Sequence, residues 1–373
     1  MLAQDKKIPR LKSLDVFRGI TIAMMILVNS PGNETAYPLL EHAEWNGCTL
    51  ADLVFPFFLF IVGVSLVFAL SNKITQGVST QNLMSAVTKR AILIFCLGIF
   101  MNAVPYHLDF STLRVYGVLQ RIGICYFLAS WLFLTTRTQT QAIIALGLLI
   151  IYWMLMIYIP VPGFGTHDLT QAGNLAGYID RLFFSSDHLY EKIFDPEGIL
   201  STLPALSTTL LGNITGAWLL SHHNAFKKTS LMLVAGVLGL ATGWLCSFWF
   251  PINKNLWSDS FVLWTAGFSL LLLASCYWLI EVKHWKRWSK PFEIFGVNAI
   301  ALYVLHIFFL RFQHMIPIAR IDGSPGHLRF YITEHLFNWA SLPAASLLYA
   351  CSYILFWLVI FSILYRNKIF IRI

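Results

Sequence analysis

Apolar stretches of close to twenty residues recur along this chain, and they limit its fold more strongly than any other feature. Each is long enough to cross a hydrocarbon layer about 30 Å thick as a helix. Hydrophobic residues make up 57% of the 373 positions and charged residues only 12%. A soluble protein of this size could not keep so much apolar surface from water. We therefore predict an all-α fold, a polytopic membrane helical bundle.

The hydrophobic pattern predicts about ten transmembrane helices in a single integral-membrane domain, residues 1–373. The predicted spans cover residues 14–30, 50–71, 86–104, 115–136, 141–160, 203–221, 229–250, 259–281, 293–312 and 343–365. Two connections, about 161–202 and about 313–342, are much longer than the others. Loops of that length often carry function.

Lysine and arginine residues predict the orientation. Alternate crossings place 18 of the 26 basic residues on the same side as both chain ends. Because basic loops stay in the cytoplasm, we expect cytoplasmic N- and C-termini. The compact size and the lack of a recognisable processing segment favour a bacterial inner membrane. No basic patch has interleaved aromatic residues in a polar context, so no nucleic-acid partner is expected.

The first helix opens with a charged pair and closes with a polar residue. Asp15 and Arg18 are three positions apart and share a helix face. They could form an ion pair at the membrane interface, or they could contact a cytoplasmic cofactor. Asn29 lies at the other end of this helix, directly before a Ser-Pro-Gly break.

The first outer loop combines a histidine with aromatic and polar residues. His42 lies just outside the membrane with Trp45 and Asn46. Thr49 and Asp52 have the spacing of a capping box for the second helix, which accounts for both without chemistry. Capping does not account for His42, although a single loop histidine usually has no catalytic role.

Further polar residues lie in or near later helices. Arg114 and Arg121 are two turns apart on the predicted fourth helix and share a face with each other. The partner of Arg121 could be a carboxylate of another helix or a ligand group. Asn298 and His306 are about two turns apart on the predicted ninth helix, where they could line a polar cavity or be satisfied core residues. The long outer loop contains Phe194-Asp-Pro-Glu-Gly198, which is typical of a turn and could also offer carboxylates to a substrate.

Five motifs, in register, carry a family resemblance. They are Ser13-Leu-Asp-Val-Phe-Arg-Gly19, His42-Ala-Glu-Trp-Asn-Gly47 with Asp52-Leu-Val-Phe-Pro56, Gly117-Val-Leu-Gln-Arg-Ile-Gly123, Phe194-Asp-Pro-Glu-Gly198, and Phe295-Gly-Val-Asn-Ala299 with Tyr303 and His306. Together they resemble the heparan-alpha-glucosaminide N-acetyltransferase family, which includes bacterial relatives linked to N-acetylglucosamine utilisation.

The resemblance implies a reaction. Acetyl-CoA would bind from the cytoplasmic face, and its acetyl group would pass to an amino sugar on the periplasmic side. The family's active-site histidine maps onto His42, which the predicted topology independently places outside. Two departures stand out: Tyr116 replaces an expected proline, and the large lumenal N-terminal region of the animal enzyme has no counterpart. The latter favours glucosamine or a cell-wall fragment over heparan.

Acetyl transfer to an amine needs a base, a polarised carbonyl and a thiolate leaving group. Histidine suits the first role because it changes charge between pH 5 and 8, or it could itself be acetylated. Asn29, Asn46 or Asn298 could donate a hydrogen bond to the thioester oxygen; Asn29 and Asn298 are favoured because both lie within predicted helices. Cytoplasmic cations should hold the CoA phosphates, with Arg121 deeper near the pantetheine. We assign cofactor binding to Asp15, Arg18, Arg90, Gln120, Arg121 and Arg287, and substrate binding to Trp45, Asn46, Asp52, Asp195, Glu197 and His306.

Two other functions fit a helical bundle with polar interior residues. One is an amino-sugar transporter, although no inverted repeat is evident. The other is a related membrane acyltransferase with another acyl donor or a glycan acceptor. The expected partners are acetyl-CoA, an amino sugar or glucosamine-ended glycan and the lipid bilayer, with a homodimer as one option. The six cysteines form no metal-binding spacing, so no metal is expected.

Overall fold

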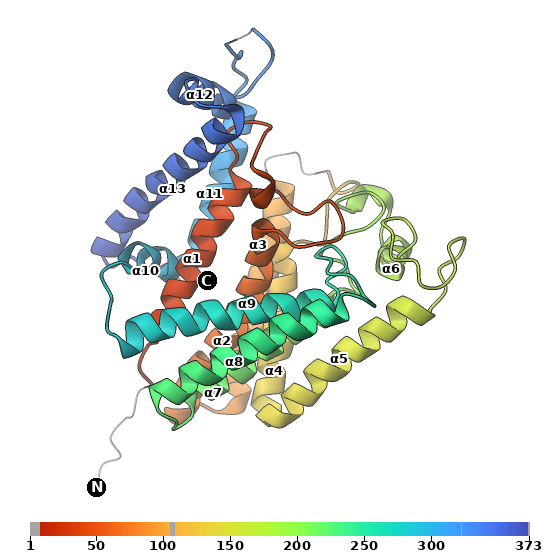
Figure 1. Ribbon diagram of the computed structural model, residues 1–373, viewed down its shortest axis with the longest axis vertical. Coiled ribbons are helices and arrows are strands. Elements are labelled where there is room, and N and C mark those ends of the chain that lie inside the picture. The colour runs from red at the N-terminus through yellow and green to blue at the C-terminus, as the bar shows by residue number, and fades with distance from the viewer. Residues whose placement is uncertain (1–7, 105–108, 322, 372–373) are drawn as a thin grey trace. The chain divides into compact units, whose positions relative to one another are not determined.

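A computed structural model describes residues 8–104, 109–321 and 323–371 (Figure 1). Within these residues the regular structure is helical, apart from isolated bridges between Val161 and Gly165 and between Pro317 and His327. The all-α prediction is therefore confirmed. The helices fall into two compact units, and each is described by itself.

The first unit comprises Phe55–Val282 with short N-terminal pieces that include Glu44–Gly47. Its helices are most of α2 (Leu50–Thr75), then α3 (Thr80–Ala103), α4 (Val118–Thr135), α5 (Thr138–Tyr158), α6 (Leu175–Phe183), α7 (Thr202–Leu220), α8 (Ala225–Cys246) and α9 (Asp259–Tyr277), with one 3₁₀ turn, Ser186–His188, and a terminal π turn, Trp278–Val282. Helices α8 and α9 run side by side (Figure 1). A Cβ at Gly267 would lie 2.8 Å from the Gly236 carbonyl oxygen, so a small residue permits this close packing.

The second unit comprises Lys12–Ala43, Cys48–Val54 and Lys283–Ile373. Its helices are α1 (Lys12–Asn29), the 3₁₀ turn Pro38–Leu40, the first residues of α2, α10 (Lys290–Val297), α11 (Ala299–Met315), α12 (Leu328–Phe337) and α13 (Leu342–Arg366). Helices α1 and α10 meet at Gly19 and Gly296. A Cβ at Gly19 would lie 1.8 Å from the Phe292 carbonyl oxygen, so this crossing excludes any larger residue.

Seven helices in the described part of the chain are long and apolar enough to cross a membrane. They are α2, α3, α4, α5, α8, α9 with its terminal π turn, and α13. Each of the ten predicted spans contains a helix, including α1 and α7. The fold is thus a polytopic membrane helical bundle, while the count of ten and the sides of the termini stay predictions.

The predicted continuous helix over 293–312 is wrong. The chain bends by 85° between α10 and α11. Asn298 lies at the bend, where its buried side-chain amide donates to the Ile369 carbonyl (3.1 Å) and accepts from the Ile371 N–H (2.9 Å). These two bonds to a distant segment hold Asn298 at the bend.

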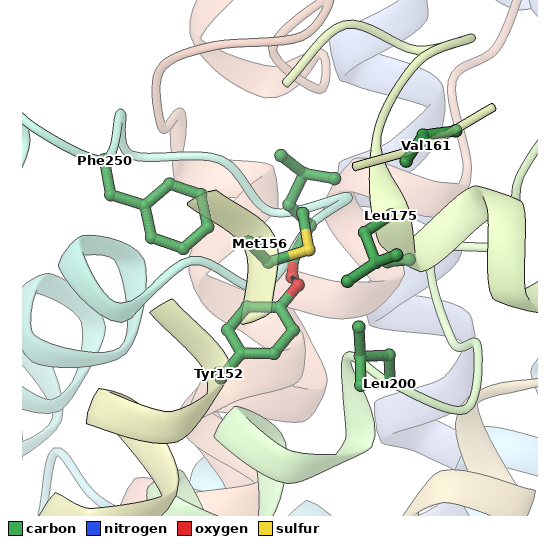
Figure 2. Packing of buried hydrophobic residues seen from close by; sticks show 8 residues of the cluster. Tyr152, Met156, Val161, Leu175, Leu200 and Phe250 are labelled. Atoms are coloured by element: carbon green, nitrogen blue, oxygen red, sulfur yellow. Dashed lines mark hydrogen bonds between the residues drawn. The ribbon is translucent and has the colours of Figure 1, made fainter. Parts of the chain in front are cut away.

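The long segment after α5 is anchored by its own apolar core (Figure 2). Tyr152 and Met156 of α5 pack with Val161, Leu175 and Leu200. The Tyr152 hydroxyl also donates to the Leu256 carbonyl in the α8–α9 connection. These contacts fix the loops on either side of α6, and Trp45 packs against the same core.

Candidate active site

His42 is hydrogen-bonded to a buried carboxylate. Its Nδ1 lies 2.8 Å from Oδ1 of Asp52. The Asp52 side chain is 1% exposed and that of His42 is 51% exposed. Because a carboxylate accepts, this bond assigns the proton to Nδ1 and the imidazole lone pair to Nε2. The pair therefore has the orientation that a general base requires.

Asp52 also organises the loop and the start of α2. Its Oδ2 accepts from the backbone N–H groups of Ala43 (3.1 Å) and Thr49 (3.0 Å) and from the Thr49 hydroxyl (3.1 Å). The Thr49 hydroxyl is also 2.6 Å from the Glu41 carbonyl. Asp52 thus supplies its half of the predicted capping box, while Thr49 ties the loop back on itself. One carboxylate both begins the helix and orients His42.

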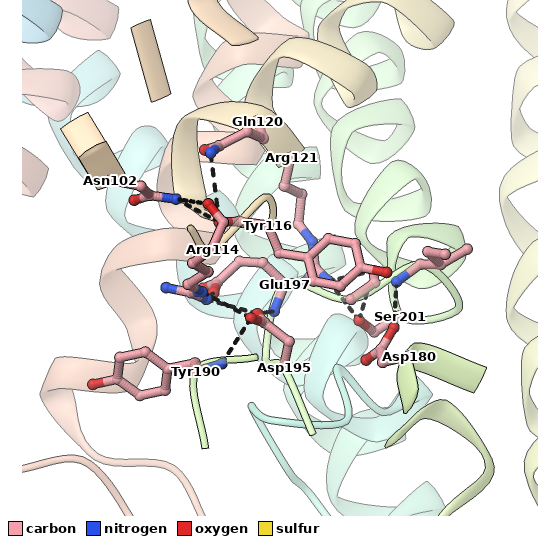
Figure 3. Close-up of polar contacts among 12 residues, drawn as sticks. Asn102, Arg114, Tyr116, Gln120, Arg121, Asp180, Tyr190, Asp195, Glu197 and Ser201 are labelled. Carbon is pink, nitrogen blue, oxygen red and sulfur yellow. Dashed lines mark hydrogen bonds and ion pairs between the residues drawn. The ribbon is translucent and has the colours of Figure 1, made fainter. Parts of the chain in front are cut away.

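A second polar cluster lies in the other unit, between the segment before α4 and the loop before α7 (Figure 3). Arg114 makes a two-pronged contact with Asp195, from Nε at 2.7 Å and from Nη2 at 2.6 Å. Its Nη2 also contacts Glu197. Its guanidinium lies 4.7 Å from the centre of the Tyr190 ring. The adjacent carboxylates raise the pKa of Arg114 despite its burial, so this charge is permanent.

The two carboxylates of this cluster differ in what they can still bind. Asp195 also accepts from the N–H groups of Tyr190 (3.1 Å) and Glu197 (3.0 Å), and its side chain is fully buried. With two bonds on each oxygen, its acceptor capacity is filled. Glu197 uses only Oε2 among the described contacts and is 10% exposed. Of the two predicted substrate contacts, Glu197 therefore has the accessible oxygen, and Asp195 holds the loop.

Arg121 is buried in the first turn of α4. Its Nη2 donates to the Gly198 carbonyl (3.1 Å) and contacts the Ser201 hydroxyl. Its guanidinium lies 5.2 Å from the Trp257 ring centre. Within the described residues, its Nε and Nη1 have no hydrogen-bond partner. The described hydrogen-bond partners of Arg121 are thus a carbonyl and a hydroxyl, not a carboxylate of another helix, and a contact of its two remaining N–H groups with a ligand stays a prediction.

Asp180 of α6 completes the cluster. Its Oδ1 accepts from the Ile199 N–H at 3.0 Å. Burial, helped by the charge of Asp195, raises its pKa to about 6. Burial and the same carboxylates raise the pKa of Tyr116. A Cβ at Gly198 would lie 2.0 Å from Asp180 Oδ2, so the glycine of the Phe194–Gly198 motif admits this carboxylate.

The prediction that Arg114 and Arg121 share a helix face is wrong. Helix α4 begins at Val118, and Arg114 precedes it in irregular backbone. The Asn102 side chain donates to the carbonyls of Arg114 and Tyr116, both at 2.8 Å, and so satisfies them outside the helix. Gln120, a predicted cofactor contact, donates weakly to the Tyr116 carbonyl at 3.4 Å. Arg114, Asp180 and Ser201 were not assigned a role from sequence, because their partners are distant along the chain.

Trp45 and Asn46 line an open pocket in the first unit. It has a volume of about 420 Å³, and Leu169, Thr170 and Gln171 form its other wall. The Trp45 and Phe194 rings pack in a T-shaped arrangement with centroids 5.1 Å apart.

The charged pair of the first helix forms as predicted from its spacing. Arg18 Nη1 lies 3.1 Å from Asp15 Oδ1 and 3.0 Å from the Gly296 carbonyl. These contacts join α1 to the end of α10. They support the ion-pair interpretation, and a contact of either residue with CoA stays a prediction.

The remaining predicted residues occupy different settings. Asn29 is the exposed last residue of α1, and Asn298 lies at the α10–α11 bend, not within a helix. His306 is fully buried, and its Nδ1 is 3.0 Å from the Leu302 carbonyl. Arg90 is exposed, with its guanidinium 5.2 Å from the Tyr126 ring centre. Arg287 is exposed in the connection before α10.

Comparison with known proteins gives a consistent result. Residues 10–242 match the family described as "Heparan-alpha-glucosaminide N-acetyltransferase, catalytic". The Homo sapiens protein named heparan-alpha-glucosaminide N-acetyltransferase is 32% identical over 421 aligned positions, and the Mus musculus protein of that name is 30% identical over 420. Each alignment covers 98% of this chain and 60% of the relative, so the chain spans 60% of the length of these curated relatives.

Proposed function

This chain belongs to the heparan-alpha-glucosaminide N-acetyltransferase family, and from that premise we propose that it is a membrane N-acetyltransferase that transfers an acetyl group from acetyl-CoA to the amine of an amino sugar. The His42–Asp52 pair is the observation that carries the proposal. A half-exposed imidazole on a buried carboxylate has the geometry of a base held in one tautomer.

The proposed chemistry uses both partners of the pair. Nε2 of His42 takes the proton as the substrate nitrogen attacks the thioester carbonyl carbon. The C–N bond forms, the C–S bond breaks, and CoA leaves as a thiolate. Asp52 stabilises the imidazolium that results, because its carboxylate lies 2.8 Å from Nδ1. No covalent enzyme intermediate is needed for this sequence of steps.

The positions of exposed arginine residues suggest the side of the membrane from which each substrate binds. CoA carries several phosphate groups, which exposed cations bind. Arg90 and Arg287 lie in segments that the loop-charge bias assigns to the cytoplasm, and both are exposed. We propose that they hold the CoA phosphates and that the amino sugar arrives from the opposite, periplasmic side. Arg114 and Asp195 hold Glu197 in its loop, and a contact of Glu197 with the amino sugar stays a prediction.

The test is release of free thiol from acetyl-CoA by the purified chain when glucosamine is added. His42→Ala should lower turnover by at least about 100-fold, because general-base catalysis contributes about 10²–10⁴ in rate. Asp52→Asn should lower turnover by a factor in the same range. His222→Ala is the matched control, since this histidine is exposed in the α7–α8 loop, and it should keep full turnover.

Two results would contradict the proposal. Thiol release by His42→Ala at the wild-type rate would remove the base. Movement of labelled glucosamine across vesicles by wild type, with no thiol release under any acceptor, would identify a transporter.

A further inference from the structure

The open pocket beside Trp45 has the chemistry of a sugar site. Its lining residues are two apolar ones, Trp45 and Leu169, and three polar uncharged ones, Asn46, Thr170 and Gln171. Its volume of about 420 Å³ lies within the range of about 300–1,000 Å³ that is usual for small-molecule sites. A tryptophan and uncharged amides match the two surfaces of a pyranose ring, which are C–H faces and hydroxyl edges.

Some polar groups of the lining residues are hydrogen-bonded within the protein, and others are available to a ligand. The Trp45 indole N–H already donates to the Leu169 carbonyl at 2.9 Å, so Trp45 can contribute only its apolar ring to a ligand. Asn46 uses its Oδ1 to accept from Asn253 at 3.2 Å, and no described contact occupies its Nδ2. The Gln171 side chain has no partner among the described residues. Two amides therefore remain for hydroxyl groups.

The walls are fixed before any ligand binds. Trp45 packs against Phe194 and the core below α6, and the Gly47 N–H donates to the Ile252 carbonyl at 2.7 Å. On the other wall, the Thr170 N–H and hydroxyl both donate to Asp168 Oδ1, at 2.8 and 2.6 Å. A rigid site loses less conformational entropy when it binds.

The wall of the pocket offers no cation to an acidic ring. All five lining residues are uncharged. The charged side chains next to them in sequence are carboxylates, Glu44 and Asp168. The guanidinium of Arg181 is committed to the carbonyls of Ala172 (3.1 Å) and Ile193. A uronate or sulfate is best held by an arginine or lysine in the wall, and none of the five lining residues is one.

Chain connectivity relates this pocket to the reaction. Three peptide steps separate Trp45 from His42, so their Cα atoms can be at most about 11 Å apart. Resting on the proposed function, we infer that the Trp45 pocket binds an uncharged sugar ring attached to the reacting amino sugar. The acceptor is then a glucosamine-ended glycan with a neutral neighbouring unit, and free glucosamine is a truncated form of it.

The test compares three acceptors: free glucosamine, glucosaminyl-N-acetylglucosamine and glucosaminyl-glucuronate. The neutral disaccharide should exceed both others in kcat/KM by about tenfold, which is the scale of one aromatic contact. Trp45→Ala and Gln171→Ala should each reduce this ratio toward one. Trp249→Ala removes a tryptophan that is 67% exposed outside the pocket, and it should leave the ratio unchanged.

A binding measurement separates this inference from the acetyl-transfer proposal. Saturation-transfer NMR with the unreactive neutral disaccharide diacetylchitobiose should show contact with wild type and loss of contact in Trp45→Ala and in Gln171→Ala. That result would support the pocket even if no acceptor were acetylated. Equal kcat/KM for the three acceptors, or contact that both pocket variants retain, would overturn the inference.

Discussion

Asp180 lies outside the membrane spans, and the fold clearly shifts the pKa of its carboxyl group. Burial raises its pKa from 3.8 to about 6, and the nearby charge of Asp195 adds to the rise. The folded state therefore binds this proton more tightly than the unfolded chain does. Between about pH 4 and pH 6, the free energy of unfolding therefore falls as pH rises. Above about pH 6 the buried carboxylate is ionised, and the full free-energy cost of burying its charge is present.

Replacement of Asp180 by asparagine should remove that cost. We expect Asp180→Asn to raise the thermal midpoint relative to wild type at pH 8, where the cost is at most about 3 kcal/mol. The gain should shrink as pH falls and vanish near pH 4. Asp109→Asn is the control of opposite sign, because hydrogen bonds from Ser111 lower the pKa of Asp109. A gain for Asp180→Asn that is constant from pH 4 to pH 8 would contradict the assignment.

At the scale of elements, the loop Phe194–Gly198 depends on one arginine from another segment. Arg114 holds Asp195 through two nitrogens and contacts Glu197 with one of them. A lysine ammonium is a point charge and cannot reproduce this planar fork. The loop and the start of α4 thus behave as one unit, although 81 positions separate Arg114 from Asp195.

Arg114→Lys should loosen this loop without removing charge. We expect a loss of about 1–3 kcal/mol in stability and faster proteolysis between Tyr190 and Gly198. Thermal unfolding and timed digestion in detergent would measure both. Arg137→Lys is the matched control, because Arg137 is exposed before α5. Equal digestion rates for the two variants would show that Arg114 does not anchor the loop.

Element positions were predictable where the signal was local. Hydrophobic runs located all the long helices, since each run must be buried or face lipid whatever its neighbours are. The start of α4 and the bend at Asn298 were not predictable, because both depend on partners far along the chain. The Asn102 side chain hydrogen-bonds to the carbonyls of Arg114 and Tyr116. The backbone groups of Ile369 and Ile371 hydrogen-bond to the Asn298 side chain.

The same distinction applies to the candidate site. The His42–Asp52 contact joins residues ten positions apart, and the motif made His42 a candidate from sequence. The contact itself is not predicted, since the sequence assigns Asp52 to helix capping and to substrate binding. Asp180 and Ser201 give no local signal, and Arg114 is noticeable only for its spacing from Arg121. The contacts of all three come from segments that meet only in the folded chain.

At the scale of the whole molecule, the proposed reaction requires opposite sides for the histidine loop and the basic connections. In a background with all six cysteines replaced, Glu44→Cys should react with an impermeant maleimide on intact cells. Arg287→Cys should react only after permeabilisation, because the loop-charge bias places it inside. Both residues are exposed, so lack of access would not arise from burial. Labelling of both in intact cells would contradict transfer across the membrane.

The carboxylate at position 52 has a consequence for genetics. In a saturation-mutagenesis survey, changes at position 42 should leave the amount of protein in the membrane intact and abolish growth that needs turnover. Changes at position 52 should depress both, because one oxygen of the carboxylate starts the helix and the other aligns the imidazole. Substitutions at position 42 therefore separate turnover from protein abundance, whereas substitutions at position 52 change both together.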